Sequence, residues 1–154
     1  MPAPIIVNTA LSHVALRVTD VDRAIAWYGA VLGYEVLTNG HAPTPDRTRN
    51  AIGLVGAGTV ALEFLETPTG KRHDIETLGV AGLSLTVPDL DAAVAAYNES
   101  GRGQTQAWPA EDWRVAFLFD PDGNVIELVQ QPPGVATMAG FAPEMRRRRE
   151  AGRK

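Results

Sequence analysis

The sequence contains no cysteine among its 154 residues. This absence excludes a disulfide framework and any thiolate metal site, so a bound metal must take its ligands from His, Asp or Glu. Long apolar runs are also missing, and the first ten residues, MPAPIIVNTA, have no basic flank. We therefore expect neither a signal peptide nor a membrane span, and a cytoplasmic protein is the default expectation.

Basic charge is scarce outside the end of the chain. Residues 132–154 carry six Lys and Arg against two Glu, a balance of +4, while the whole chain has a net charge of −4. Residues 1–131 therefore carry −8, which argues against a nucleic-acid partner for this part. The basic run in the tail is typical of a solvated helix, and contact with RNA or a membrane is the less favoured alternative.

The first half of the chain has the pattern of a strand, a helix and three further strands. An alternating stretch comes first, and an amphipathic stretch follows that has Thr19 or Asp20 as its N-terminal cap and Gly33 as its C-terminal cap. Gly and Pro content predicts a loop over 39–45. The predicted strands of this half are 11–18, 34–37, 49–55 and 59–66.

The second half repeats this pattern after a linker. Asp89 opens a second predicted helix, and the predicted strands are 82–87, 104–108, 113–119 and 125–131. At an offset of 69, Asp20 falls on Asp89, and at an offset of 64, Glu63 falls on Glu127. The predicted organisation is an N-terminal segment, a first module, a linker, a second module and a basic tail, bounded as 1–10, 11–66, 67–80, 81–131 and 132–154.

The stretch FDPDGNVIELVQ, residues 119–130, combines a turn with a strand that carries one carboxylate. Its Asp-Pro-Asp-Gly run predicts the turn, and Glu127 shares a strand face with Val125 and Val129. A buried carboxylate needs an ionic partner or a metal, whereas an exposed glutamate on an edge strand needs neither. The stretch by itself leaves both interpretations open.

Two modules that open with SHVALRVTDVDRAIAWY and GLSLTVPDLDAAVAAY and end in DPDGNVIELVQ resemble the vicinal oxygen chelate superfamily. Its members include glyoxalase I, extradiol dioxygenases, fosfomycin-modifying enzymes and bleomycin-binding resistance proteins. The resemblance covers residues 11–131 and implies an α+β fold of two tandem βαβββ modules, whose curled mixed sheets form a cup-shaped pocket. It also implies a homodimer and a small-molecule substrate.

The family takes its metal ligands from the first and last strands of each module. By this resemblance the expected ligands are His13, Glu63 and Glu127, and the fourth position falls on Gly82, which has no side chain. One His and two carboxylates suit Fe, Mn, Co, Ni or Zn as divalent ions. The position left open by Gly82 is expected to take water or a substrate oxygen. His73, in the linker, is expected at the surface, with replacement of the missing ligand as its alternative.

The expected lining of the substrate pocket consists of Arg17, Ser84, Thr86, Trp108 and Trp113. Arg17 is expected either to bind an anionic group of the substrate or to pair with a neighbouring carboxylate. The two tryptophans either line the pocket for a flat ligand or pack in the core.

Three functions are compatible with the resemblance. We favour a divalent-metal-dependent lyase or isomerase that acts on a small oxygenated substrate through a metal-bound enolate, with Glu63 or Glu127 as the base. A metal-free drug-binding resistance protein is the first alternative, and Gly82 and the tryptophans favour it. The second is a tailoring enzyme of secondary metabolism that performs a cyclisation or rearrangement in the same pocket.

Overall fold

A computed structural model divides the chain into two compact units, Met1–His73 and Asp74–Lys154. The residues that it describes are 11–43, 47–56, 58, 60–72, 79–110, 113–135, 142–143, 146–147 and 151. Each unit is described by itself. Within these described residues, no helix has the length and apolar character that a membrane span requires.

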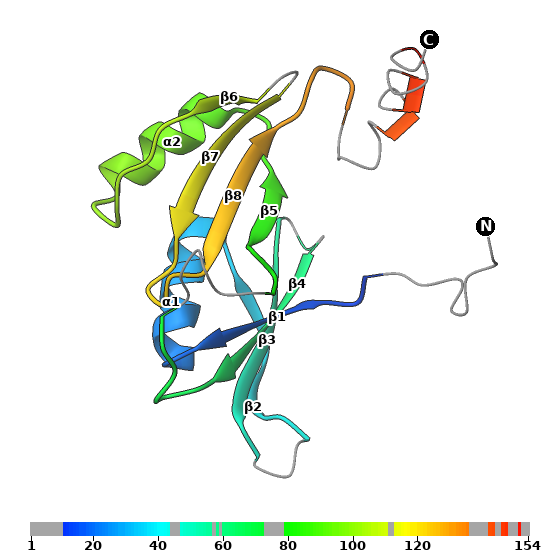
Figure 1. The fold of residues 1–154 in the computed structure, drawn as a ribbon. Coiled ribbons are helices and arrows are strands. Elements are labelled where there is room, and N and C mark those ends of the chain that lie inside the picture. Colours follow the sequence, from blue (N-terminus) through cyan, green and yellow to red (C-terminus); the bar gives the residue numbers. More distant parts are fainter. Residues whose placement is uncertain are drawn as a thin grey trace, which may run out of the picture. The chain divides into compact units, whose positions relative to one another are not determined.

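The first unit is a four-stranded sheet with one helix (Figure 1). Its strand order is β1-β4-β3-β2; β1 runs parallel to β4, and the other neighbours are antiparallel. In chain order the elements are β1 Val14–Val18, α1 Val21–Leu32, β2 Glu35–His41, β3 Arg49–Val55 and β4 Val60–Glu66.

The second unit has the same element order and the same sheet order, β5-β8-β7-β6. Its elements are β5 Leu83–Thr86, α2 Leu90–Glu99, β6 Trp108–Ala110, β7 Trp113–Phe119 and β8 Val125–Gln130. The predicted α+β class with two tandem βαβββ modules is therefore confirmed. The cup-shaped pocket would involve both units, and it stays a prediction.

Strand registers confirm the internal duplication. Ala15 is the Cα partner of Glu63 across the parallel pair β1–β4, and Ser84 is the partner of Glu127 across β5–β8. The two pairs are related by the offsets of 69 and 64 found in the sequence. In each unit, parallel pairing thus brings the start of the module beside its end.

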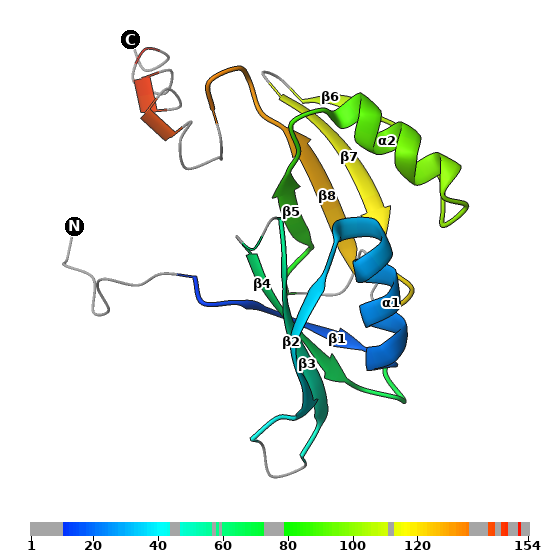
Figure 2. The same cartoon turned by 180° about the vertical axis from the view of Figure 1, so that it is seen from behind.

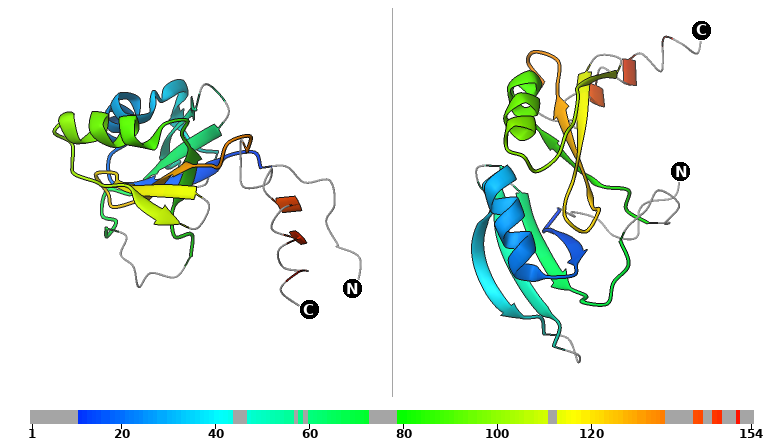
Figure 3. Two further views of the ribbon diagram at one scale, coloured as in Figure 1. Left: turned by 90° about the horizontal axis from the view of Figure 1, so that it is seen from above. Right: turned by 90° about the vertical axis from the view of Figure 1, so that its left-hand side faces the viewer.

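Each helix covers one face of its own sheet (Figures 2 and 3). α1 contacts β3 and β4, and α2 contacts β7 and β8. The covered faces hold fully buried side chains, among them Leu62 and Phe64 in the first unit and Leu118 and Ile126 in the second. Because successive strand residues point to opposite faces, the intervening residues lie on the uncovered face, here called the open face of each sheet.

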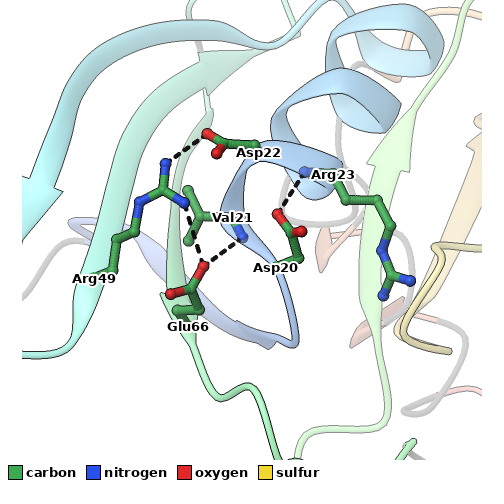
Figure 4. Close-up of polar contacts among 6 residues, drawn as sticks. All are labelled: Asp20, Val21, Asp22, Arg23, Arg49 and Glu66. Atoms are coloured by element: carbon green, nitrogen blue, oxygen red, sulfur yellow. Dashed lines mark hydrogen bonds and ion pairs between the residues drawn. The ribbon is translucent and has the colours of Figure 1, made fainter.

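A polar cluster, here called the helix clamp, holds the start of α1. Its residues are Asp20, Val21, Asp22, Arg23, Arg49 and Glu66 (Figure 4). Glu66 Oε1 accepts a hydrogen bond from the Val21 N–H at 3.2 Å, and Arg49 lies 3.3 Å from Glu66 Oε1 and 2.5 Å from Asp22 Oδ1. These contacts satisfy a backbone donor of the first helical turn and tie the helix to β3 and β4.

The helix clamp is duplicated at α2. Gln130 Oε1 accepts from the Leu90 N–H at 3.0 Å, and the Arg114 guanidinium binds both oxygens of Asp91 at 2.7 and 2.8 Å. Asp89 caps this helix as Asp20 caps α1. The sequence left Thr19 or Asp20 as the cap of α1, and the structure shows Asp20; the expected cap Asp89 is confirmed.

The predicted loop over 39–45 is wrong for its first three residues, because β2 extends to His41. Asn39, Gly40 and His41 pair with Ala51, Asn50 and Arg49 of β3, after a register shift between Val36 and Thr38. The shift restores the pairing beyond Leu37, so the Gly in this stretch does not end the strand.

The predicted strand 104–108 is wrong for its first four residues, since β6 is Trp108–Ala110. The side chain of Asn98 forms two hydrogen bonds with the backbone of Thr105. Its amide donates to the Thr105 carbonyl at 3.0 Å, and its Oδ1 accepts from the Thr105 N–H at 2.8 Å. These backbone groups are therefore not available for pairing with β7.

Much of the predicted linker and tail lies outside the described residues. Of the linker, 73–78, including His73, are not described, and of the basic tail only 132–135, 142–143, 146–147 and 151 are. The predicted segment boundaries stay predictions.

Gly53 provides the first test of the packing. A Cβ at this position would overlap the Glu35 carbonyl and the ring of Tyr34, which is buried against Phe64 at a ring separation of 4.8 Å. We expect Gly53→Ala to lower the free energy of unfolding by about 1–3 kcal/mol, measured by urea titration. Gly29→Ala is the control: its nearest neighbour is 3.8 Å away, so the change should be neutral or stabilising.

The Asp91–Arg114 pair generates a pH prediction. The hydrogen bond from Arg114 is the main cause that lowers the pKa of Asp91 below its ordinary value of 3.8. The ion pair therefore contributes fully to stability above pH 3.8, and this contribution is lost as the pH falls through the lowered pKa of Asp91. Asp91→Asn should be less stable than the wild type at pH 7, and the difference should be smaller at a pH well below 3.8.

Urea unfolding of the wild type, Asp91→Asn, Arg114→Gln and the double variant at both pH values measures this effect. The free energy of unfolding should fall no further in the double variant than in either single variant, because all three variants remove the same interaction. A difference that does not change with pH would contradict the ion pair as its source.

Candidate metal and substrate site

The open face of the first sheet carries the polar residues predicted for the first module. His13 lies directly before β1, and strand alternation places it on the same face as Ala15 and Arg17. Since Ala15 is the partner of Glu63, the parallel register brings the carboxylate of β4 next to this row. The sequence-based grouping of His13, Arg17 and Glu63 on one face is consistent with this register.

His13 and Glu63 face one another directly. Nε2 of His13 lies 3.4 Å from Oε2 of Glu63, and the side chains are 43% and 15% exposed. On the other side of the ring, Nδ1 lies 3.2 Å from Oγ of Ser12. A metal ion on Nε2 would leave the ring proton on Nδ1, where Ser12 Oγ can accept it; without an ion, Nε2–H can instead donate to the carboxylate.

The second oxygen of Glu63 is held by Asn50, a residue that the sequence analysis missed. Asn50 Nδ2 donates to Glu63 Oε1 at 2.7 Å, and Asn50 itself is only 7% exposed. A signal was present in the sequence: Asn50 is a lone amide in the otherwise apolar run NAIGLV. An amide buried in such a strand requires a hydrogen-bond partner, but the sequence does not reveal which one.

Tyr34 lies in the core of the same unit, near Glu63. Its hydroxyl donates to the Leu62 carbonyl at 3.3 Å. Burial, and then the charge of Glu63, raise the pKa of Tyr34 to about 12. The phenol therefore stays protonated at neutral pH, as a hydroxyl donor in the core.

Arg17 extends from the same face toward the end of β4. Its Nη1 donates to Thr67 Oγ1 at 3.1 Å, and the side chain is exposed. The expected contact with an anionic substrate group stays a prediction.

Glu127 lies on the open face of the second sheet, beside its partner Ser84. The Ser84 hydroxyl donates a short hydrogen bond to Glu127 Oε2. Thr86, two residues further along β5, lies on the same face and is exposed.

Both tryptophans of the predicted pocket lie on this open face as well. Trp108 is the partner of Val115, and Phe117 is the partner of Glu127. Alternation along β7 places Trp113 on the same side as Val115 and Phe117. Trp108 is 51% exposed and Phe117 40% exposed, so the open face that carries Glu127 also carries exposed aromatic rings, of which Phe117 lies directly beside Glu127.

Gly82 stands where the duplication would place a counterpart of His13. A Cβ at Gly82 would lie 2.8 Å from the Val125 carbonyl oxygen and 3.0 Å from Val125 Cβ. A histidine could enter this position only if the backbone of β8 moved, so Gly82 is required by the close approach of the two strands.

The described residues bring together two of the three expected ligands. His13 meets Glu63 in the first unit, while Glu127 belongs to the second. In the part of the chain that the structure describes, no three His, Asp or Glu side chains form a group that could hold a metal. The three-ligand set thus stays a prediction.

The chain is similar to proteins of one known family. A family model described as the Glyoxalase/Bleomycin resistance protein/Dioxygenase superfamily matches residues 10–128. The chain is 29% identical to a probable lactoylglutathione lyase of Vibrio parahaemolyticus serotype O3:K6 over 137 residues, which cover 86% of this chain and 99% of that protein. It is 31% identical to the lactoylglutathione lyase of Escherichia coli O157:H7 over 127 residues, 79% of this chain and 92% of that one.

Solved structures show the same fold. A glyoxylase/bleomycin resistance protein/dioxygenase domain from Frankia sp. EAN1pec superposes with a TM-score of 0.69 at 24% identity, over 80% of this chain and 98% of that one. The fosfomycin resistance protein FosX from Listeria monocytogenes, in complex with Mn(II) and sulfate, superposes with a TM-score of 0.62 at 17% identity. This superposition covers 88% of this chain and 99% of that one.

Proposed function

The chain belongs to the glyoxalase/bleomycin resistance protein/dioxygenase superfamily, and we propose that it is a metal-dependent lyase or isomerase acting on a small oxygenated substrate. Relatives named lactoylglutathione lyase, at about 30% identity over most of the chain, make lactoylglutathione the first compound to assay. The proposal includes a homodimer in the cytoplasm.

The observation that carries this proposal is the facing pair of His13 and Glu63. Two atoms that each bind one ion at about 2.1 Å lie at most about 4.2 Å apart. The 3.4 Å between His13 Nε2 and Glu63 Oε2 satisfies this limit. An imidazole nitrogen and a carboxylate oxygen, both oriented by neighbours, therefore fit a divalent ion.

His13 and Glu63, with Glu127 as the third ligand, would hold the metal in this proposal. One imidazole and two carboxylates are a donor set for Fe, Mn, Co, Ni or Zn. When bound, such an ion supplies Lewis-acid polarisation of a substrate carbonyl.

Proton transfer is assigned to the carboxylates. Both oxygens of Glu63 face side chains, His13 and Asn50, which restricts its movement. Glu127 accepts from the exposed Ser84 hydroxyl, which can rotate away. We therefore assign removal of the proton next to the substrate carbonyl to Glu127, whose carboxylate would have to be free of the ion to act as a base, and the anchoring role to Glu63.

The remaining predicted residues bind the substrate in this proposal. Arg17 offers a guanidinium for an anionic group, and Ser84 and Thr86 offer hydroxyls. Trp108 and Trp113 offer apolar surface on the face that carries Glu127.

A metal-free binding protein for small flat molecules is the second candidate. The exposed aromatic rings on the open face that carries Glu127 and the closed position at Gly82 favour it. In this case the aromatic face would provide the affinity, and Glu127 would recognise a donor on the ligand.

Metal content separates the two candidates. Protein purified without chelators should hold close to one ion per chain, and His13→Ala and Glu63→Ala should hold a small fraction of that amount. His41→Ala is the matched control, because His41 lies on β2 and is not a proposed ligand. Formation or cleavage of lactoylglutathione should follow the metal content across these variants.

Elemental analysis after supplementation with Fe(II), Mn(II), Ni(II) or Zn(II) is the decisive measurement. A wild-type protein without bound metal under all four conditions would contradict the metalloenzyme and leave the metal-free binding protein.

A further inference from the structure

We infer that Asn50 is a positioning residue that fixes the carboxylate of Glu63 so that only Oε2 is presented beside His13. This inference rests on the proposed function and adds to it a residue outside the expected ligand set. Three observations carry it: a short amide–carboxylate contact, the burial of the amide, and the residue found at the matching place in the second unit.

The contact itself determines which atom of Asn50 faces Glu63. An ionised carboxylate only accepts hydrogen bonds, so the Asn50 amide nitrogen must donate to Oε1, at 2.7 Å. Hydrogen bonds to a charged acceptor are stronger than those between neutral groups. Because Asn50 is 7% exposed, water does not readily replace it.

The second unit shows that the fold does not require an amide at this position. Asn50 pairs with Leu65, two residues after Glu63. At the matching place, Val115 pairs with Val129, two residues after Glu127. Val115 is also 7% exposed, so the same site in the same sheet is filled by an apolar side chain.

Burial of an amide costs free energy that burial of a valine does not. The sheet of the second unit forms with valine, so sheet formation does not account for the amide of the first unit. What distinguishes the first unit is that its carboxylate also faces a histidine. The amide is therefore best explained by the orientation of Glu63 toward His13.

In this arrangement the two carboxylate oxygens of Glu63 have different partners. Oε1 is committed to Asn50, and Oε2 remains for the ion beside His13 Nε2. Without the amide, the side-chain torsions of Glu63 would be free to move the carboxylate away from His13. Asn50 thus makes Glu63 a one-oxygen ligand of fixed direction.

Asn50→Val tests the inference, and the native Val115 indicates that this substitution is compatible with the fold. Loss of a residue that orients a ligand typically weakens metal affinity by about 10–100-fold. We expect the Kd for Mn(II) and Zn(II), measured by calorimetry on the full chain, to rise by this factor. An unchanged Kd would overturn the inference while leaving the proposed function intact.

Asn98→Ala is the matched control. Asn98 is also a hydrogen-bonded asparagine, but it holds Thr105 in the second unit. Its loss should lower the melting temperature without changing the Kd for either metal. An equal rise of Kd in Asn98→Ala would show a general effect of destabilisation and would contradict a specific role of Asn50.

A second measurement uses the metal-free protein. Three-bond couplings of the Glu63 side chain, measured by NMR in the presence of a chelator, should show one rotamer in the wild type and averaging in Asn50→Val. A Glu63 that stays fixed in the variant overturns the inference. A wild type that binds no metal contradicts the proposed function, while the rotamer result still decides whether Asn50 orients Glu63.

Discussion

Parallel pairing of the first and last strands is the constraint on which each unit depends. Chain neighbours connect most easily as antiparallel strands, whereas β1 and β4 are parallel and enclose a helix and two strands between them. This pairing places His13 beside Glu63, although they lie 50 positions apart in the chain. It also places Ser84 beside Glu127, which lie 43 positions apart. Residues from both ends of a module can therefore meet on one open face.

The duplicated units retain the contacts that build the fold and differ in those that build the site. Helix caps, clamp arginines and strand registers recur in both units. On the open faces, the first unit has His13 where the second has Gly82, and it has Asn50 where the second has Val115. Close contact of Gly82 with Val125 shows that the difference extends to the backbone. The two open faces are thus chemically unequal, with a polar pair on one and aromatic rings on the other.

Sequence patterns predicted the elements whose signals are local. Asp20 and Asp89 as caps, and β3 and β7 with their full bounds, follow from cap chemistry and alternation. The end of β2 and the position of β6 were missed because they depend on a register shift against β3 and on the hydrogen bonds between Asn98 and Thr105, which strand alternation does not reveal. Asn50 was missed for the same reason: nothing in its neighbours shows that it faces Glu63.

The placement of Glu63 explains how a small unit can hold its carboxylate in a fixed direction. Glu63 lies between Leu62 and Phe64, and Glu127 between Ile126 and Leu128. The neighbours of Glu63 are fully buried on β4, which is an inner strand of its sheet, so its backbone is anchored on both sides. His13, by contrast, precedes a short strand at the edge of the sheet and is partly exposed. A ligand on a rigid element needs only its side-chain torsions fixed, and the hydrogen bond from the amide of Asn50 restrains these torsions in Glu63.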